Sequence, residues 1–272
     1  ALNAAASAAR AANGVLKLPP GIGCYIAGKF DTTGHGSGSW AIEGSGSAWS
    51  SSTLKVIATE RWSHALDLSG FKGGRLENFT LTTAPGVTCW SGLFPANAAG
   101  QGGMDMLVAR NLYVSGNFHA GALYPVDFAS SAFHDCKFYN YNPSSGGVAA
   151  FFSAGNGWQA QSNFQQVIND THLVGDIAFV ACEFHDFSGN PGSPGAILFD
   201  GCVNIPMFKP IISQLKGSNQ LMLCVNNPRE CKLYSPAIYV DEGPQYQYTF
   251  ACPSGHTATD VGRDNKLGRG LA

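Results

Sequence analysis

Three side chains in the middle of the chain have residue types suited to acid–base chemistry. Asp170 and His172 belong to one short segment, and Asp200 lies in a later segment of similar apolar character. Two carboxyl groups held close together can hydrolyse a glycosidic bond, one as the acid and the other as base or nucleophile. A histidine beside them can shift their pKa values or bind substrate. We therefore predict Asp170, Asp200 and His172 as catalytic residues, with solvated aspartates at strand ends as the alternative.

A second group of polar and aromatic side chains is suited to contact with a sugar polymer. Tyr113, Lys137, Tyr139, Glu183 and His185 are expected on one strand of the coils, and the preceding strand adds Glu77, Arg110 and His134. Aromatic rings pack on sugar faces, whereas charged groups bind hydroxyls or uronate carboxylates. The same residues also fit a structural role, with Lys137 and Glu183 as a cross-strand ion pair beside an aromatic pair of Tyr139 and His185. A third interpretation is a lyase site with Tyr139, His185 or Lys137 as the base.

A six-residue repeat predicts the elements that carry these side chains. The matches are LENFTL from Leu76, ARNLYV from Ala109, FHDCKF from Phe133, FVACEF from Phe179, MFKPII from Met207 and LYSPAI from Leu233. The first and sixth positions are apolar, and alternation at period two on both sides indicates two short strands joined by a sharp bend. The predicted bend residues are Asn78, Asn111, Asp135, Ala181, Lys209 and Ser235. Stacked coils of about 24 to 28 residues, with three strands each, predict an all-β, right-handed parallel β-helix of about six to seven coils.

Another apolar strand is expected upstream of each hexamer. The segments are HALDLSG, GALYPVDF, VINDTHL, GAILFDG and LMLCVNN. Their alignment places Asp67, Tyr124, Asp170, His172, Asp200 and Asn226 outward on one face, with Asp170 and Asp200 on neighbouring coils. Asp67 and Tyr124 are therefore predicted to bind substrate. Gly-rich insertions at about 84–103 and 141–166 are expected to leave the coils at one corner beside this face.

The chain is predicted to form one β-helix between two end segments. Residues 1–30 comprise an Ala-rich capping helix, stopped by Asn13-Gly14, and the first strands. Residues 31–250 form the coils, and 251–272 form a C-terminal tail or cap. A solenoid must cover its open apolar end, which a short amphipathic helix can do.

Composition narrows the function classes. A net charge of −2 provides no basic field for nucleic acid, and no apolar run is long enough to predict membrane insertion. Charged residues make up only 12%, with 34 glycines, which favours an all-β protein rich in turns. The eight cysteines include no CxxC pair, so most are predicted to be small buried side chains. No cofactor or metal is predicted.

Two segments near the N-terminus carry a family resemblance. ALNAAASAARAANGVLKLPPGIGCYIAG and ALDLSGFKGGRLENFTLTT resemble the cap and first coils of pectate-lyase-like β-helices. This group includes bacteriophage tailspikes and many polysaccharide lyases and hydrolases. The resemblance extends to about residue 85 and implies the fold strongly, but the chemistry only weakly, because the fold hosts several chemistries and pure binders.

Apolar residues at outward positions of the later coils predict an assembly. Val180, Phe208, Ile211 and Tyr234 should not face water, so a loop or another subunit is expected to cover them. The tailspike resemblance favours a homotrimer. We therefore expect a tailspike or tail-fibre β-helix that recognises a bacterial surface polysaccharide, with or without depolymerising it. Its expected location is the phage virion or otherwise extracellular, with other tail proteins joined through a segment upstream of Ala1. The alternatives are a free secreted polysaccharide lyase or glycoside hydrolase, and a purely structural β-helix of a virion or cell surface.

Overall fold

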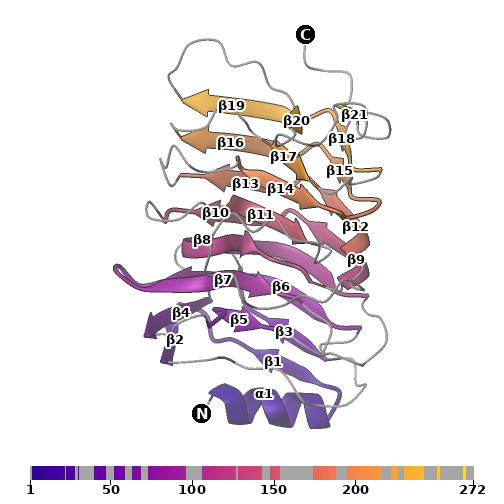
Figure 1. Cartoon of the computed structure of the whole chain (residues 1–272). Helices are drawn as coiled ribbons and strands as arrows, with labels where there is room; N and C mark the ends of the chain where they lie inside the picture. Colours follow the sequence, from indigo (N-terminus) through magenta and orange to yellow (C-terminus); the bar gives the residue numbers. More distant parts are fainter. Residues whose placement is uncertain are drawn as a thin grey trace.

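The computed structural model is built mostly of parallel strands that stack along one axis (Figure 1). It describes residues 2–21, 23–27, 30, 40–46, 52–58, 63–68, 73–95, 106–126, 128–142, 148–153, 174–187, 195–215, 222–225, 230–241, 250–251 and 266–267. Neighbouring strands within these ranges pair in parallel, each with a strand of the next coil. The molecule is therefore mostly β, with a large parallel sheet that fits an all-β parallel β-helix. No helix in the described part is long and apolar enough to cross a membrane.

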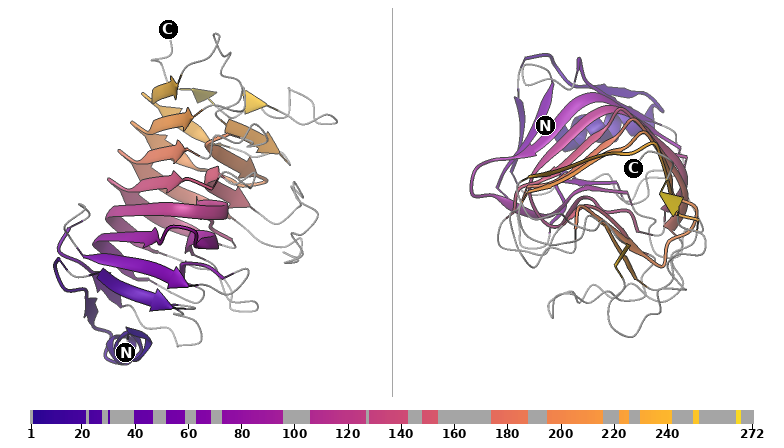
Figure 2. Two further views of the ribbon diagram at one scale, coloured as in Figure 1. Left: turned by 90° about the vertical axis from the view of Figure 1, so that its left-hand side faces the viewer. Right: turned by 90° about the horizontal axis from the view of Figure 1, so that it is seen from above.

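The strands fall into three stacks, seen end-on in the right-hand view of Figure 2. The first stack contains β5 (Leu66–Asp67), β7 (Thr88–Phe94), β11 (Val148–Ser153), β14 (Ile197–Asp200), β17 (Met222–Val225) and β20 (Phe250–Ala251). The second contains β1 (Val15–Lys17), β3 (Ala41–Glu43), β9 (Phe128–His134), β12 (Val174–Val180), β15 (Pro206–Phe208), β18 (Lys232–Tyr234) and β21 (Lys266–Leu267). The third contains β2 (Gly23–Ala27), β4 (Thr53–Ala58), β10 (Lys137–Asn140), β13 (Glu183–Asp186), β16 (Ile211–Leu215) and β19 (Ala237–Asp241).

Two long strands bend from one stack into another. β6 (Arg75–Thr83) runs from the second stack into the third, and β8 (Val108–Leu123) continues through the third stack into the first. Both contain a hexamer, so the bend lies inside the strand. These two strands therefore connect the three stacks without a break in the strand.

The six predicted bend residues all adopt the left-handed conformation, which confirms the hexamer interpretation. Their φ values are 61° at Asn78, 50° at Asn111, 53° at Asp135, 52° at Ala181, 51° at Lys209 and 51° at Ser235. Asparagine and aspartate tolerate this conformation better than most residues. Asn111 also donates a side-chain hydrogen bond to Asn78 on the neighbouring coil, over 2.9 Å. The left-handed bend therefore recurs at the matching position of successive coils.

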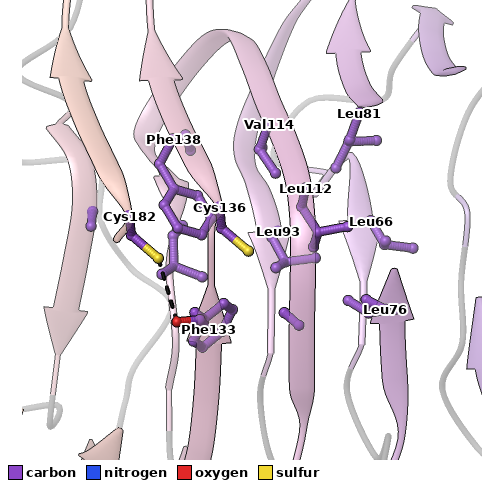
Figure 3. Close-up of a cluster of buried hydrophobic side chains, with 14 of the residues drawn as sticks. Leu66, Leu76, Leu81, Leu93, Leu112, Val114, Phe133, Cys136, Phe138 and Cys182 are labelled. Carbon is purple, nitrogen blue, oxygen red and sulfur yellow. Dashed lines mark hydrogen bonds between the residues drawn. The ribbon is translucent and has the colours of Figure 1, made fainter. Parts of the chain in front are cut away.

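In the five hexamers from LENFTL to MFKPII, the first and sixth positions point into a continuous core, as the alternation predicts (Figure 3). Phe133 stacks on Phe179 with ring centroids 4.9 Å apart, and Phe138 stacks on Phe184 at 5.5 Å. Burial of such rings is the main favourable contribution to the fold. Five cysteines outside any disulfide are also buried here, namely Cys89, Cys136, Cys182, Cys202 and Cys231, which confirms their predicted role.

The N-terminal helix lies at the end of the strand stack (Figure 1). α1 (Leu2–Ala11) buries Ala6 in the core that also contains Leu16 of β1. Asn13 has a φ of 48°, and the amide of Gly14 donates to the carbonyl of Ala9, so the helix stops where Asn13-Gly14 predicts.

Two strands of the first stack lie inside the ranges expected to be insertions. β7 lies within 84–103 and pairs with β5 and β8. β11 lies within 141–166 and pairs with β8 and β14. The first-stack strand between β8 and β14 is therefore 148–153, and the predicted strand VINDTHL lies outside the described residues.

Replacing Ala181 by glycine is expected to stabilise the protein by about 0.5–1 kcal/mol. An L-residue in the left-handed region costs about 1–2 kcal/mol, and glycine removes this cost but loses more entropy on folding. Ala178→Gly in β12 is the matched control, since the same substitution in an extended strand destabilises by about 0.5–1 kcal/mol. Urea unfolding of the two variants should shift the midpoint in opposite directions, and a shift of both to lower urea would contradict the assignment of Ala181 to a strained bend.

Candidate functional site

Asp200, predicted to be catalytic, and Asp67, predicted to bind substrate, do not lie at the surface. Asp200 is 0% exposed and Asp67 is 4% exposed. In the sheet, Asp200 pairs with Ser153 on one side and Val225 on the other, so the alignment that placed Asp170 beside it is wrong. The error arises because β11 occupies the position assigned to VINDTHL. Asp170 and His172 themselves lie outside the described residues.

Tyr124, predicted to bind substrate, belongs to a buried aromatic cluster on the same outer side of the first stack. Its ring packs on Phe94 and Phe151, with centroids 5.6 Å and 5.0 Å away. The tyrosine is 3% exposed. Burial, and secondarily the charge of Asp200, raise the pKa of Tyr124 well above its usual range. This outward side is therefore a second apolar layer, and the predicted exposure of Tyr124 is wrong.

The third stack, by contrast, brings the other predicted residues together. Lys137 of β10 pairs with Tyr113 of β8 on one side and Glu183 of β13 on the other. Tyr139 pairs with His185 in the same register. Both neighbour relations were predicted from the hexamers and are confirmed. We call the outward side chains of this region the third-stack cluster, which comprises Tyr113, Lys137, Tyr139, Tyr141, Glu183, His185, Phe187 and Ser213.

Glu183 is the centre of the cluster. Its carboxylate accepts hydrogen bonds from the ammonium of Lys137 at 2.8 Å and the hydroxyl of Tyr139 at 2.6 Å. Nε2 of His185 lies 3.2 Å from the same carboxylate. Burial alone raises the pKa of Glu183, but these hydrogen bonds and the charges of Lys137 and His185 outweigh it, so the pKa is lowered from its usual value. The carboxylate is therefore ionised at neutral pH.

His185 links Glu183 to a residue that sequence reasoning missed. Its Nδ1 is hydrogen-bonded to the hydroxyl of Ser213, on the neighbouring strand β16. Burial lowers the pKa of His185, and the charge of Glu183 only partly offsets this. The imidazole is consequently neutral at neutral pH. A single serine in ISQL carries no sequence signal, although its register with His185 could have been read from the hexamer alignment.

Aromatic rings cover one end of the cluster. Tyr139 has its ring 5.0 Å from Tyr113 and 5.5 Å from Phe187. Tyr141 stacks on Phe187 at 5.3 Å and is 40% exposed. Burial and the hydrogen bond with Tyr113 raise the pKa of Tyr141 above its usual range, so its hydroxyl remains protonated. The cluster therefore combines an accessible aromatic surface with a charged centre.

Arg110 lies on a different stack from this cluster. It forms an ion pair with Glu77 at 3.7 Å on the second stack, where Glu77, Arg110 and His134 occupy successive coils. The same ladder continues through Val180 to Phe208 and Tyr234. Arg110 thus contacts Glu77 and is not brought to the third-stack cluster.

The fold and the cluster define a class of protein, a solenoid of parallel strands with a polar and aromatic strip on one outer face. Within the described ranges, no group of three or more His, Cys, Asp or Glu side chains is placed to hold a metal ion. Comparison with protein-family models, with curated proteins and with solved structures found no match to this chain.

Proposed function

We propose that the protein is a right-handed parallel β-helix of about six to seven coils, capped by α1, that recognises a bacterial surface polysaccharide through the third-stack cluster. The observation that carries the proposal is the arrangement of aromatic rings around the Lys137–Glu183 pair on three neighbouring coils. Such a surface presents apolar ring faces and fixed polar groups together, which is what a sugar polymer requires.

Each part of the cluster has a binding role in this proposal. The exposed ring of Tyr141, backed by Phe187, offers an apolar surface for one sugar face. Lys137 is 45% exposed at its side chain, so its ammonium can bind a sugar hydroxyl or carboxylate while Glu183 holds it in place. The ordered coils fix both groups in advance, so little conformational entropy is lost on binding.

An apolar ridge on the second stack supports an assembled particle over a solitary enzyme. Phe208 and Tyr234 stack with ring centroids 4.8 Å apart and are 42% and 41% exposed. Exposed aromatic rings in contact with one another are typical of interaction surfaces. We extend the proposal to a phage tailspike or tail-fibre homotrimer in which this ridge faces a neighbouring subunit.

A free lyase or glycoside hydrolase has less support at the residues predicted for it. Burial, and then the hydrogen bond to Glu183, raise the pKa of Tyr139 well above its usual range, which makes its hydroxyl a poor general base. Asp200 is fully buried, so a hydrolytic role at the surface would require it to become exposed.

The proposal is tested by removing the exposed ring of the cluster. Tyr141→Ala is expected to weaken polysaccharide binding about tenfold, since a ring contact contributes about 1.4 kcal/mol, close to the upper end for aromatic pairs. Affinity electrophoresis in gels containing purified capsular polysaccharide or lipopolysaccharide measures the retardation. Tyr25→Ala on β2 is the matched control, because Tyr25 is 64% exposed on the same stack but lies outside the cluster.

The two outcomes are distinct. Retardation that falls in Tyr141→Ala and persists in Tyr25→Ala supports the cluster as the binding site. Equal retardation of Tyr141→Ala and the wild type would contradict the site. A wild-type protein that no capsular polysaccharide or lipopolysaccharide retards would contradict the function.

A further inference from the structure

The third-stack cluster contains a hydrogen-bonded chain that polysaccharide binding does not require. Ser213 is bonded to Nδ1 of His185, and Nε2 of the same ring lies 3.2 Å from Glu183. Hydroxyl, imidazole and carboxylate therefore stand in line across β16 and β13. This is the order in which a nucleophile, its general base and the group that orients the base are arranged in acyl-transfer sites.

The tautomer of His185 follows from the carboxylate. An ionised carboxylate only accepts hydrogen bonds, so Nε2 must carry the proton that it shares with Glu183. In a neutral imidazole the other nitrogen, Nδ1, then has a free lone pair facing the hydroxyl of Ser213. The lowered pKa of His185 keeps the ring in this neutral form. Ser213 thus faces a base that is ready to take its proton.

The placement of Ser213 separates it from a structural serine. Its neighbour Ile212 is buried in the core, so Ser213 points to the outer side of the coil. Ser115 occupies the corresponding outward position on β8, beside Tyr139, but its hydroxyl bonds to Thr82 over 3.4 Å. Both serines are nearly equally buried, at 7% and 6% exposure, and Ser213 is the one hydrogen-bonded to a histidine.

We propose that Ser213, His185 and Glu183 hydrolyse acyl esters on a sugar polymer, with Ser213 as the nucleophile. The inference takes its substrate class from the proposed function. The relay itself needs only an ester whose carbonyl carbon reaches the Ser213 hydroxyl. O-acyl groups on a polysaccharide bound along the third-stack cluster would meet this requirement.

The reaction balances without a cofactor or an oxidant. The Ser213 oxygen attacks the ester carbonyl while Nδ1 of His185 takes the hydroxyl proton, and Glu183 stabilises the resulting imidazolium. The bond to the sugar oxygen then breaks, and that oxygen takes the proton from Nδ1, which leaves the acyl group on Ser213. Water attacks the acyl-serine with His185 again as base, and the released proton returns to Ser213 as the carboxylic acid leaves. The hydroxyl proton of Tyr139 is already donated to Glu183, whereas the ammonium of Lys137 has two further N–H donors besides the one on Glu183.

The test compares three variants on two ester probes, 4-nitrophenyl acetate and a chemically O-acetylated polysaccharide. Release of 4-nitrophenol or acetate is expected to fall at least about 100-fold in Ser213→Ala and in His185→Asn, the range for loss of a nucleophile or general base. Ser115→Ala is expected to keep the wild-type rate. Thermal melts of all variants establish that each is folded, and a fluorophosphonate probe with peptide mass spectrometry reports on Ser213 without turnover.

The results separate this inference from the proposed function. An adduct on Ser213 together with ester release that depends on Ser213 supports the relay. Release that survives in Ser213→Ala, or a wild type with neither release nor adduct, overturns it. A wild type that polysaccharide retards but that cleaves neither ester leaves glycan binding standing and removes the relay. Cleavage of 4-nitrophenyl acetate through Ser213 without retardation by any polysaccharide keeps the relay and removes the proposed function.

Discussion

Replacing Phe179 by alanine is expected to lower the free energy of unfolding by about 3–5 kcal/mol. The ring is 0% exposed and meets three others, with centroids 4.9 Å from Phe133, 5.5 Å from Phe152 and 5.4 Å from Phe184. These neighbours belong to strands held by hydrogen bonds to the coils on either side. The surrounding strands therefore cannot move in to fill the cavity that the substitution leaves. The decrease in the free energy of unfolding should lie in the upper part of this range.

Phe208→Ala is the matched control for this prediction. It removes the same atoms from the next coil of the second stack, but from a side chain that is 42% exposed. Its cost should stay below about 1.5 kcal/mol, since only the stacking on Tyr234 is lost. Guanidinium unfolding followed by circular dichroism measures both variants. Equal losses would mean that Phe179 does not lie in a rigid core.

The parts of the fold that could be predicted from the sequence depend on local rules. The bend at Asn78 or Asp135 and the alternation beside it lie within one hexamer, so short-range conformational preferences were sufficient. A second set of left-handed residues, at the start of the second-stack strands, was not predicted because these residues differ in type, as Met106, Asp176 and Glu230 illustrate.

The two missed strands have compositions that resemble loops or turns. β7 contains Gly92, where an added Cβ would lie 2.5 Å from the carbonyl oxygen of Ala122 and 2.6 Å from Val114. Glycine is therefore required there by close packing between coils, not by a turn. β11 begins with Val148 and two alanines directly after a Gly-Gly pair. Its short apolar run was therefore predicted to be part of the Gly-rich insertion and not a strand.

Contacts between neighbouring strands of the candidate site could be predicted from the sequence, because they follow from the register. Burial of residues on the outer side of the first stack could not be predicted, because it depends on a second apolar layer. The pairs of Lys137 with Glu183 and of Tyr139 with His185 follow once the hexamers are aligned. Asp67 and Asp200 do point away from the core, but they are buried on that outer side. A period-two pattern distinguishes the two sides of a strand, yet it does not tell which side reaches water.

Replacing Glu183 by glutamine is expected to disable the third-stack cluster while preserving its shape. Lys137 loses its ion pair, Tyr139 loses a charged acceptor, and the imidazole of His185 loses the carboxylate that favours its protonated form. The pKa of His185, already lowered by burial, should therefore fall further in the variant. Nuclear magnetic resonance titration of the imidazole protons measures this directly.

The pH dependence of stability gives the same substitution an independent signature. His185 titrates below 6.5 in the folded protein, so the unfolded chain binds more protons and stability falls as the pH drops below 6.5. The groups that face it are Glu183, Lys137, Tyr139 and Ser213, and only the carboxylate makes its protonation easier. Glu183→Gln should thus lose more stability than the wild type between about pH 7 and 5, by the linkage relation.

At lower pH the wild type, and not Glu183→Gln, is expected to lose stability faster as the pH falls. Glu183 contributes stability that is present above 4.5 and is lost as the pH falls through its lowered folded pKa, and glutamine has no such loss. Thermal melts from neutral to acid pH should therefore show the wild type declining most steeply below 4.5, where the variant no longer responds at this position. Glu77→Gln is the control, because Glu77 lies on the second stack and its ion pairs are with Arg75 and Arg110 rather than with His185. Equal changes of the His185 titration in Glu77→Gln and Glu183→Gln would mean that the carboxylate of Glu183 does not interact with the imidazole. Both the third-stack cluster as a binding site and the relay of Ser213, His185 and Glu183 depend on that interaction.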